Sequence, residues 1–96
     1  MAERLSSSDI SSKLSSLTGW VLANDKPQIE KTFVRNNFLD AVGFIQKIAE
    51  IAERRDHHPD ILLHGYKNVR VMLTTHSAGG ITQNDFDLAK EIDTIA

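Results

Sequence analysis

The stretch NFLDAVGFIQKIAEIAERR, residues 37–55, carries the strongest helical pattern of the chain. Asn37 is a favoured N-cap, and Asp40 at the third helical position predicts a capping interaction. Apolar residues recur along the stretch at helical spacing. They are Phe38, Ala41, Val42, Ile45, Ile48, Ala49 and Ala52, with Phe44 and Ile51 extending the stripe toward a second side. An apolar arc this wide predicts either a deeply buried helix or a contact with another subunit.

Two pairs of short strands flank this helix. Before it, residues 20–22 and 28–34 predict two strands joined by a polar turn. After it, residues 61–63 and 67–75 predict two more around a tight turn at Gly65. Each pair therefore predicts a hairpin.

Two further helices complete the pattern. A serine at position 7 or 8 can cap a short helix with a narrow apolar stripe, which ends near Gly19. Thr82, with Asp85 three residues later, fits a capping box that starts a last helix. The whole order predicts an α+β two-layer sandwich, a four-stranded antiparallel sheet with three helices on one face. We expect a single domain over residues 1–96, with residues 1–6 as a loose tail.

Composition narrows the classes of function. The net charge of −2 gives no electrostatic reason to expect binding to nucleic acid or to an anionic membrane. The chain has no cysteine, which excludes disulfides, thiolate ligands and cysteine nucleophiles. No apolar run approaches the length that spans a bilayer, and the N-terminal segment has no apolar signal core. We therefore expect a cytoplasmic protein.

All four histidines fall within residues 57–76, which indicates proton transfer or metal binding, because histidine titrates near neutral pH. They are His57, His58, His64 and His76. If the last two strands pair as a hairpin, the start of one lies beside the end of the other. This pairing brings His57, His58 and His76 to one end of the sheet. His64 lies near the hairpin turn at the opposite end, and we exclude it.

The converging histidines fit general acid–base chemistry, and Glu53 is close enough in sequence to orient one of them. A zinc site is an alternative, although adjacent histidines seldom reach one metal and no nearby carboxylate completes a familiar ligand spacing. Ordinary surface histidines are the third interpretation. Asp85 likewise has a structural interpretation as a helix cap, and a cap at this end of the sheet can also shape a pocket.

Several of these segments together resemble a known family. They are Gly19-Trp20, Ile29–Phe33, Asn37-Phe38, Asp56–Asp60, Tyr66, Val69, Val71, Thr74–His76, Gly80–Thr82 and Asp85. In this combination the chain resembles the pterin-4a-carbinolamine dehydratases from about Leu14 to Ile92. Ile61 stands where animal members have tryptophan, and the spacing from the histidine pair to His76 is one residue longer here. Both differences bear on the wall of the substrate pocket rather than on the chemistry.

The resemblance implies dehydration of 4a-hydroxytetrahydrobiopterin to quinonoid dihydropterin, a step that supports tetrahydrobiopterin recycling, without a metal or other cofactor. It implies that His57, His58 and His76 are catalytic, with His57 and His76 as the acid–base pair and His58 as a pterin contact or alternate base. The substrate-binding positions that it implies are Glu53, Asp60, Thr75 and Asp85.

The same resemblance raises a second hypothesis. Animal members also serve as a dimerisation cofactor of a homeodomain transcription factor, through a helix bundle between subunits. The alternative function is therefore a non-enzymatic interaction module that uses the face of the helix over residues 37–55. The wide apolar stripe of that helix fits a homodimer or homotetramer.

Overall fold

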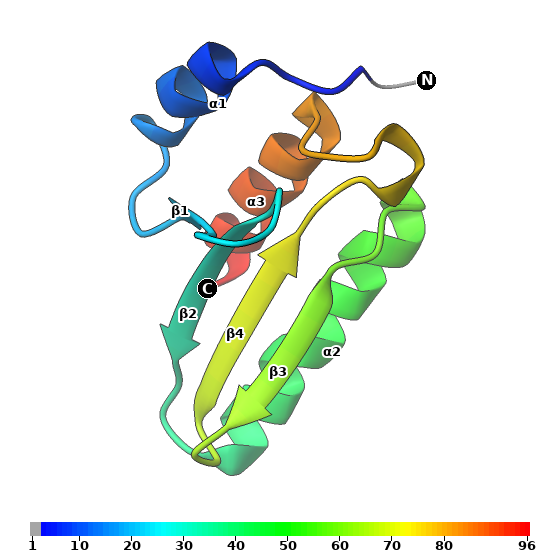
Figure 1. The fold of residues 1–96 in the computed structure, drawn as a ribbon. Helices are drawn as coiled ribbons and strands as arrows, with labels where there is room; N and C mark the ends of the chain where they lie inside the picture. The colour runs from blue at the N-terminus through cyan, green and yellow to red at the C-terminus, as the bar shows by residue number, and fades with distance from the viewer. Residues whose placement is uncertain (1–2) are drawn as a thin grey trace.

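Two hairpins join into one antiparallel sheet (Figure 1). The computed structural model describes residues 3–96. The elements are α1 (Ser7–Leu14), β1 (Val21–Leu22), β2 (Ile29–Val34), α2 (Phe38–Arg55), β3 (Asp60–His64), β4 (Asn68–Leu73), the 3-10 turn η1 (His76–Ala78) and α3 (Gln83–Ile95). The strand order is β1-β2-β4-β3, with α2 and α3 behind the sheet in this view. The predicted α+β architecture is confirmed. None of the helices within residues 3–96 has the length and apolar composition that a membrane crossing requires.

Strand alternation decides which side chains reach the core. β2 and β4 pair from Ile29↔Leu73 to Val34↔Asn68, and β3 pairs with β4 from Asp60↔Met72 to His64↔Asn68. The face toward the helices carries the buried residues Ile29, Phe33, Val69, Val71 and Leu73. The other face, called the open face below, carries Glu30, Thr32, Arg70 and Met72, all exposed or half-buried.

Helix α2 begins and ends where the sequence predicts, but its buried side is rotated from the predicted stripe. Its core residues are Ala41, Phe44, Ile48, Ile51 and Ala52. Phe44 and Ile51, predicted as a lateral extension, are only 2% and 5% exposed, whereas Phe38 and Val42 are 56% and 42% exposed. The stripe is wider than the contact with the sheet, so helical spacing alone could not tell which part of it faces the core.

The N-terminal segment is attached more firmly than a loose tail. The Leu5 amide donates to the Ile81 carbonyl (2.8 Å), and Leu5 packs against the core. The Ser6 side chain caps α1 by accepting from the Asp9 amide (3.1 Å). The prediction of a loose tail over residues 1–6 is therefore wrong for Leu5 and Ser6, because a backbone hydrogen bond and an N-cap hold them. Met1 and Ala2 lie outside the described residues.

The segment after β4 returns the chain to the end of the sheet where β3 begins. Thr75 and Gly80 form an isolated antiparallel bridge, with N–O distances of 3.0 and 3.3 Å. This bridge closes the turn that contains η1. The closed turn sets Thr82 and the start of α3 beside the end of β4, close to the point where α2 ends.

Candidate functional site

The end of α2 fixes the backbone position of His57. Asp56 adopts a left-handed conformation (φ 51°, ψ 44°), and its amide donates to the Glu53 carbonyl (3.2 Å). The His57 amide donates to the Ala52 carbonyl (3.0 Å). These two bonds form a Schellman motif, in which aspartate occupies the position that glycine usually takes. The motif directs the chain, and with it His57, away from the helix axis and toward α3.

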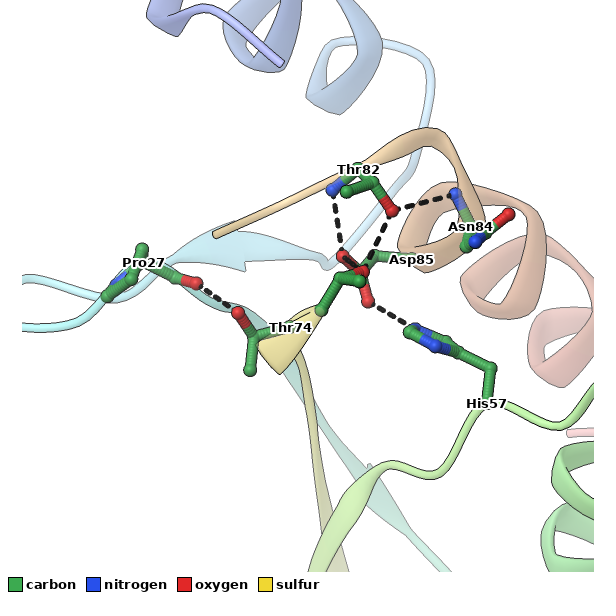
Figure 2. Close-up of polar contacts among 7 residues, drawn as sticks. Pro27, His57, Thr74, Thr82, Asn84 and Asp85 are labelled. Carbon is green, nitrogen blue, oxygen red and sulfur yellow. Dashed lines mark hydrogen bonds and ion pairs between the residues drawn. The ribbon is translucent and has the colours of Figure 1, made fainter. Parts of the chain in front are cut away.

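Asp85 is the centre of a buried polar network that receives His57 (Figure 2). One carboxylate oxygen lies 2.6 Å from His57 Nε2. The other accepts from the Thr75 hydroxyl and from the Thr82 amide, both at 2.9 Å. Thr75 and Thr82 hydroxyls are 2.8 Å apart, and the Thr82 hydroxyl also accepts from the Asn84 amide (3.2 Å). Asp85 is 0% exposed, so this carboxylate depends entirely on these donors in place of water.

Asp85 both caps α3 and belongs to the candidate site, so its two interpretations are compatible. Thr82 and Asp85 form the predicted capping box at the start of α3. Only one carboxylate oxygen serves the cap, so the second remains for His57. The His57 side chain is 14% exposed. Asp85 therefore joins the start of α3 to the end of α2, and it orients an imidazole at the edge of the sheet.

His58 forms a separate pair at the surface. Its Nε2 contacts the Glu53 carboxylate, one turn back on α2. The two side chains are 58% and 75% exposed. The predicted proximity of Glu53 to a histidine is thus present, but the partner is His58. Solvent surrounds this pair, so its attraction is weak compared with a buried pair.

A cavity of about 320 Å³ opens at the same end of the molecule. Its lining consists of Lys26, Pro27, Gln28, Asp60, Thr74, His76, Gly79 and Gly80. The Thr74 hydroxyl donates to the Pro27 carbonyl (2.7 Å) across this lining (Figure 2). Of the residues predicted for the site, His76 and Asp60 line the cavity. The others lie outside the lining: His57, His58, Glu53, Thr75 and Asp85.

Sequence reasoning missed part of this arrangement. Thr82 was foreseen only as a cap, and its hydroxyl in fact supports Thr75. Gln28 was foreseen only as a strand residue, although it lines the cavity. Its position two residues before Glu30 is a usable signal, because alternation places both on the open face. His64 pairs with Asn68 beside the hairpin turn, away from the other histidines as expected.

Within the described part of the chain, residues 3–96, no three His, Cys, Asp or Glu side chains are grouped so that they could hold a metal ion. Two of the histidines at this end, His57 and His58, are each paired with one carboxylate. Such pairs suit the transfer or holding of protons.

A family model described as pterin 4 alpha carbinolamine dehydratase matches residues 3–95. The chain belongs to this dehydratase family. The resemblance seen from the motifs is thereby confirmed, and it covers nearly the whole chain.

Two relatives from distant organisms both carry the name pterin-4-alpha-carbinolamine dehydratase provisionally. One from Thermosynechococcus vestitus is 45% identical over 96 residues, which cover 100% of this chain and 98% of that protein. One from Sulfolobus acidocaldarius is 42% identical over 92 residues, covering 96% and 98% of the two chains.

Two solved structures resemble this dehydratase-family chain. A Brucella melitensis protein, described as a transcriptional coactivator/pterin dehydratase, superposes with a TM-score of 0.92 at 35% identity, covering 98% of this chain and 99% of its own. A pterin dehydratase-like protein, described as a RuBisCO assembly factor of the alpha-carboxysome, gives a TM-score of 0.67 at 22% identity, covering 81% and 89%. At that identity the second likeness concerns the fold alone.

Proposed function

We propose that this protein dehydrates a pterin-4a-carbinolamine by histidine acid–base catalysis. In this reaction the C4a–O bond breaks, the departing hydroxyl takes up a proton and leaves as water, and the N5 proton passes to a base. The product is the quinonoid dihydropterin. The resemblance extends the proposal to 4a-hydroxytetrahydrobiopterin as substrate, and hence to the recycling of tetrahydrobiopterin.

The observation that carries this proposal is the Asp85–His57 contact at 2.6 Å within a fully buried network. An ionised Asp85 only accepts hydrogen bonds, and its other oxygen already takes two donors. With Asp85 ionised, the proton of the contact resides on His57 Nε2. Nδ1, for which no hydrogen bond is found among residues 3–96, is then the nitrogen that takes up or delivers a proton. We assign Asp85 and Thr75 to the positioning of His57.

His76 supplies the second catalytic group of the proposal. It lines the cavity together with Asp60, which follows His58 by two residues. We propose that the pterin occupies this cavity, with His76 acting opposite to His57 in the acid–base pair and Asp60 contacting the ring. His58, held by Glu53 at the surface, serves as a pterin contact or alternate base.

The decisive experiment measures carbinolamine dehydration by the parent protein and by His57→Ala and His76→Ala. We expect each variant to lose about 100-fold or more in rate, as removal of a general acid or base usually does. His64→Ala is the matched control, because this histidine lies at the other end of β3. Folded His57→Ala and His76→Ala proteins with parental activity would exclude the assigned roles, and an inactive parent would exclude the enzyme.

One observation supports contact through the face of α2, whether in assembly of this chain or in the alternative function of an interaction module. Apolar side chains on the first half of α2 are exposed: Phe38 at 56%, Leu39 at 82% and Val42 at 42%. Exposed apolar groups this close together mark contact surfaces. We propose that this face mediates a homodimer or homotetramer. Light scattering on Val42→Glu, a substitution at an exposed position of this face, tests it.

A further inference from the structure

Gln28 is one of the polar side chains of the cavity that the proposed reaction does not use. Gln28 lines the cavity and is only 8% exposed. Its backbone is held in place, because its carbonyl accepts from the Ala23 amide (2.9 Å) and its amide donates to the Lys26 carbonyl (2.8 Å). A buried amide with a fixed backbone has little freedom, so its hydrogen-bonding direction is defined by its neighbours.

Glu30 and Arg70 set that direction. Gln28 Nε2 donates to Glu30 Oε2 at 3.0 Å. Arg70 Nη2 binds both Glu30 oxygens, at 3.0 and 2.9 Å. The hydrogen bond from Gln28 lowers the pKa of Glu30 most, and the bond from Arg70 lowers it further against the opposing effect of burial. An ionised carboxylate can only accept, so the amide nitrogen of Gln28 must face Glu30. Its carbonyl oxygen is then left for the cavity.

Two other residues that line the cavity, Thr74 and Asp60, also offer hydrogen-bond acceptors. The Thr74 hydroxyl donates its hydrogen to the Pro27 carbonyl (2.7 Å), so its oxygen is available only as an acceptor. Asp60 adds a carboxylate. Gln28, Thr74 and Asp60 thus provide acceptors to one cavity. A ligand complementary to them carries adjacent N–H donors on the edge of a flat ring.

We propose that Gln28 is a specificity-determining residue whose Oε1 accepts a hydrogen bond from the amino-pyrimidinone edge of the substrate ring. This edge carries an exocyclic 2-amino group beside a ring N–H, a pair of donors. Glu30 and Arg70 are positioning residues, because they act on the ring only through the orientation of Gln28. The inference rests on the proposed function, since it specifies which edge of the pterin forms hydrogen bonds with this cavity.

The test compares two fluorescent probes, pterin and lumazine, in equilibrium binding to the full chain. Lumazine has an oxygen in place of the 2-amino group, so it presents an acceptor to Gln28 Oε1. We expect the parent to bind pterin more tightly than lumazine. Gln28→Leu should reduce this preference by about five- to tenfold, the effect of about one hydrogen bond. Gln46→Leu, at an exposed position on α2, is the matched control and should leave the preference unchanged.

A second variant keeps the inference testable if Gln28→Leu does not fold. Glu30→Gln retains the shape but adds a donor, so the Gln28 amide is free to turn over. We expect it to reduce the pterin preference as well, a change in selectivity that a purely structural role would not produce. Unchanged selectivity in both variants, with pterin still bound, would overturn this inference alone. A parent that binds neither probe would overturn the proposed function along with it.

Discussion

His57 and His58 are consecutive in the chain, and each contacts one carboxylate. The His57 partner, Asp85, is 0% exposed and comes from another helix, where three donors converge on it. The His58 partner, Glu53, lies on α2, the helix that ends just before both histidines, and is 75% exposed. Burial removes water as a competing donor, so Asp85 needs its partners, whereas Glu53 can exchange His58 for water. Two contacts of the same chemical kind therefore differ greatly in what they stabilise.

The change with the largest expected effect is Asp85→Asn. An amide has one oxygen where the carboxylate has two, so at least one of the three donors around position 85 loses its acceptor. We expect the free energy of unfolding to fall by about 2–4 kcal/mol, because buried donors are left unsatisfied. The dehydration rate should fall by about 100-fold, since His57 loses the group that fixes its proton. Urea denaturation and the dehydration assay measure the two effects.

Glu53→Gln, the matched substitution at the surface, is the control for Asp85→Asn. If Glu53→Gln lowered the free energy of unfolding as much as Asp85→Asn does, burial would not be what separates the two pairs. A variant at position 85 with parental activity would show that His57 does not depend on its carboxylate.

A smaller effect is expected from Thr75→Val, which removes one donor to Asp85 and keeps the shape of the side chain. The Asp85 oxygen then retains only the Thr82 amide, and the Thr82 hydroxyl loses its own acceptor. We expect the free energy of unfolding to fall by about 1–2 kcal/mol. Thr32→Val, on the exposed surface of β2, is the control and should change it by less than about 0.5 kcal/mol. Equal losses in both variants would contradict a special role for the Thr75 hydroxyl.

The sequence predicted most of the elements that carry this comparison because their signals are local. The Asn37 and Thr82 caps, the end of α2 before His57 and the inward direction of Thr75 all follow from spacing within a few residues. Alternation along the predicted strand over residues 67–75 puts Thr75 on the same side as Val69, Val71 and Leu73, and all four are buried.

What sequence could not predict depends on contacts between distant segments. Asp85 meets His57 across 28 residues, and Arg70 meets Glu30 across 40. The rotation of α2 that buries Phe44 and exposes Phe38 is likewise set by packing on the sheet. The common destination of the three histidines at one end of the sheet followed from strand pairing. Strand pairing did not predict that His57 joins a buried network, that His58 forms a surface pair and that His76 lines the cavity.

A third carboxylate, Glu91, lies between the two extremes. It is on α3, as Asp85 is, and it contacts Arg54 and Arg55 in the last turn of α2, the latter at 2.6 Å. The hydrogen bond from Arg54, followed by that from Arg55, lowers the pKa of Glu91. A lowered pKa in the folded state stabilises the fold above the unfolded-state pKa, and this stabilisation is lost as pH falls through the folded-state value.

The parent should therefore be more stable than Glu91→Gln above about pH 5, and the difference should vanish well below about pH 4. Thermal unfolding of both proteins across this pH range measures it. A difference that stayed constant with pH would show that the ion pairs contribute nothing and that only packing was changed. Glu50→Gln, at an exposed position on α2, controls for the loss of one negative charge.

The smallest effect is expected where the exposed pair is broken by Glu53→Gln. Solvent and salt screen the contact with His58, so the free energy of unfolding should change by about 0.5 kcal/mol or less, and less still at high salt. A double-mutant cycle with His58→Gln isolates the coupling, and the parallel cycle of Asp85→Asn with His57→Gln gives the buried counterpart. We expect the buried coupling to be several times larger. Similar couplings in both cycles would mean that chain adjacency at the end of α2, and not burial, governs how these histidines are held.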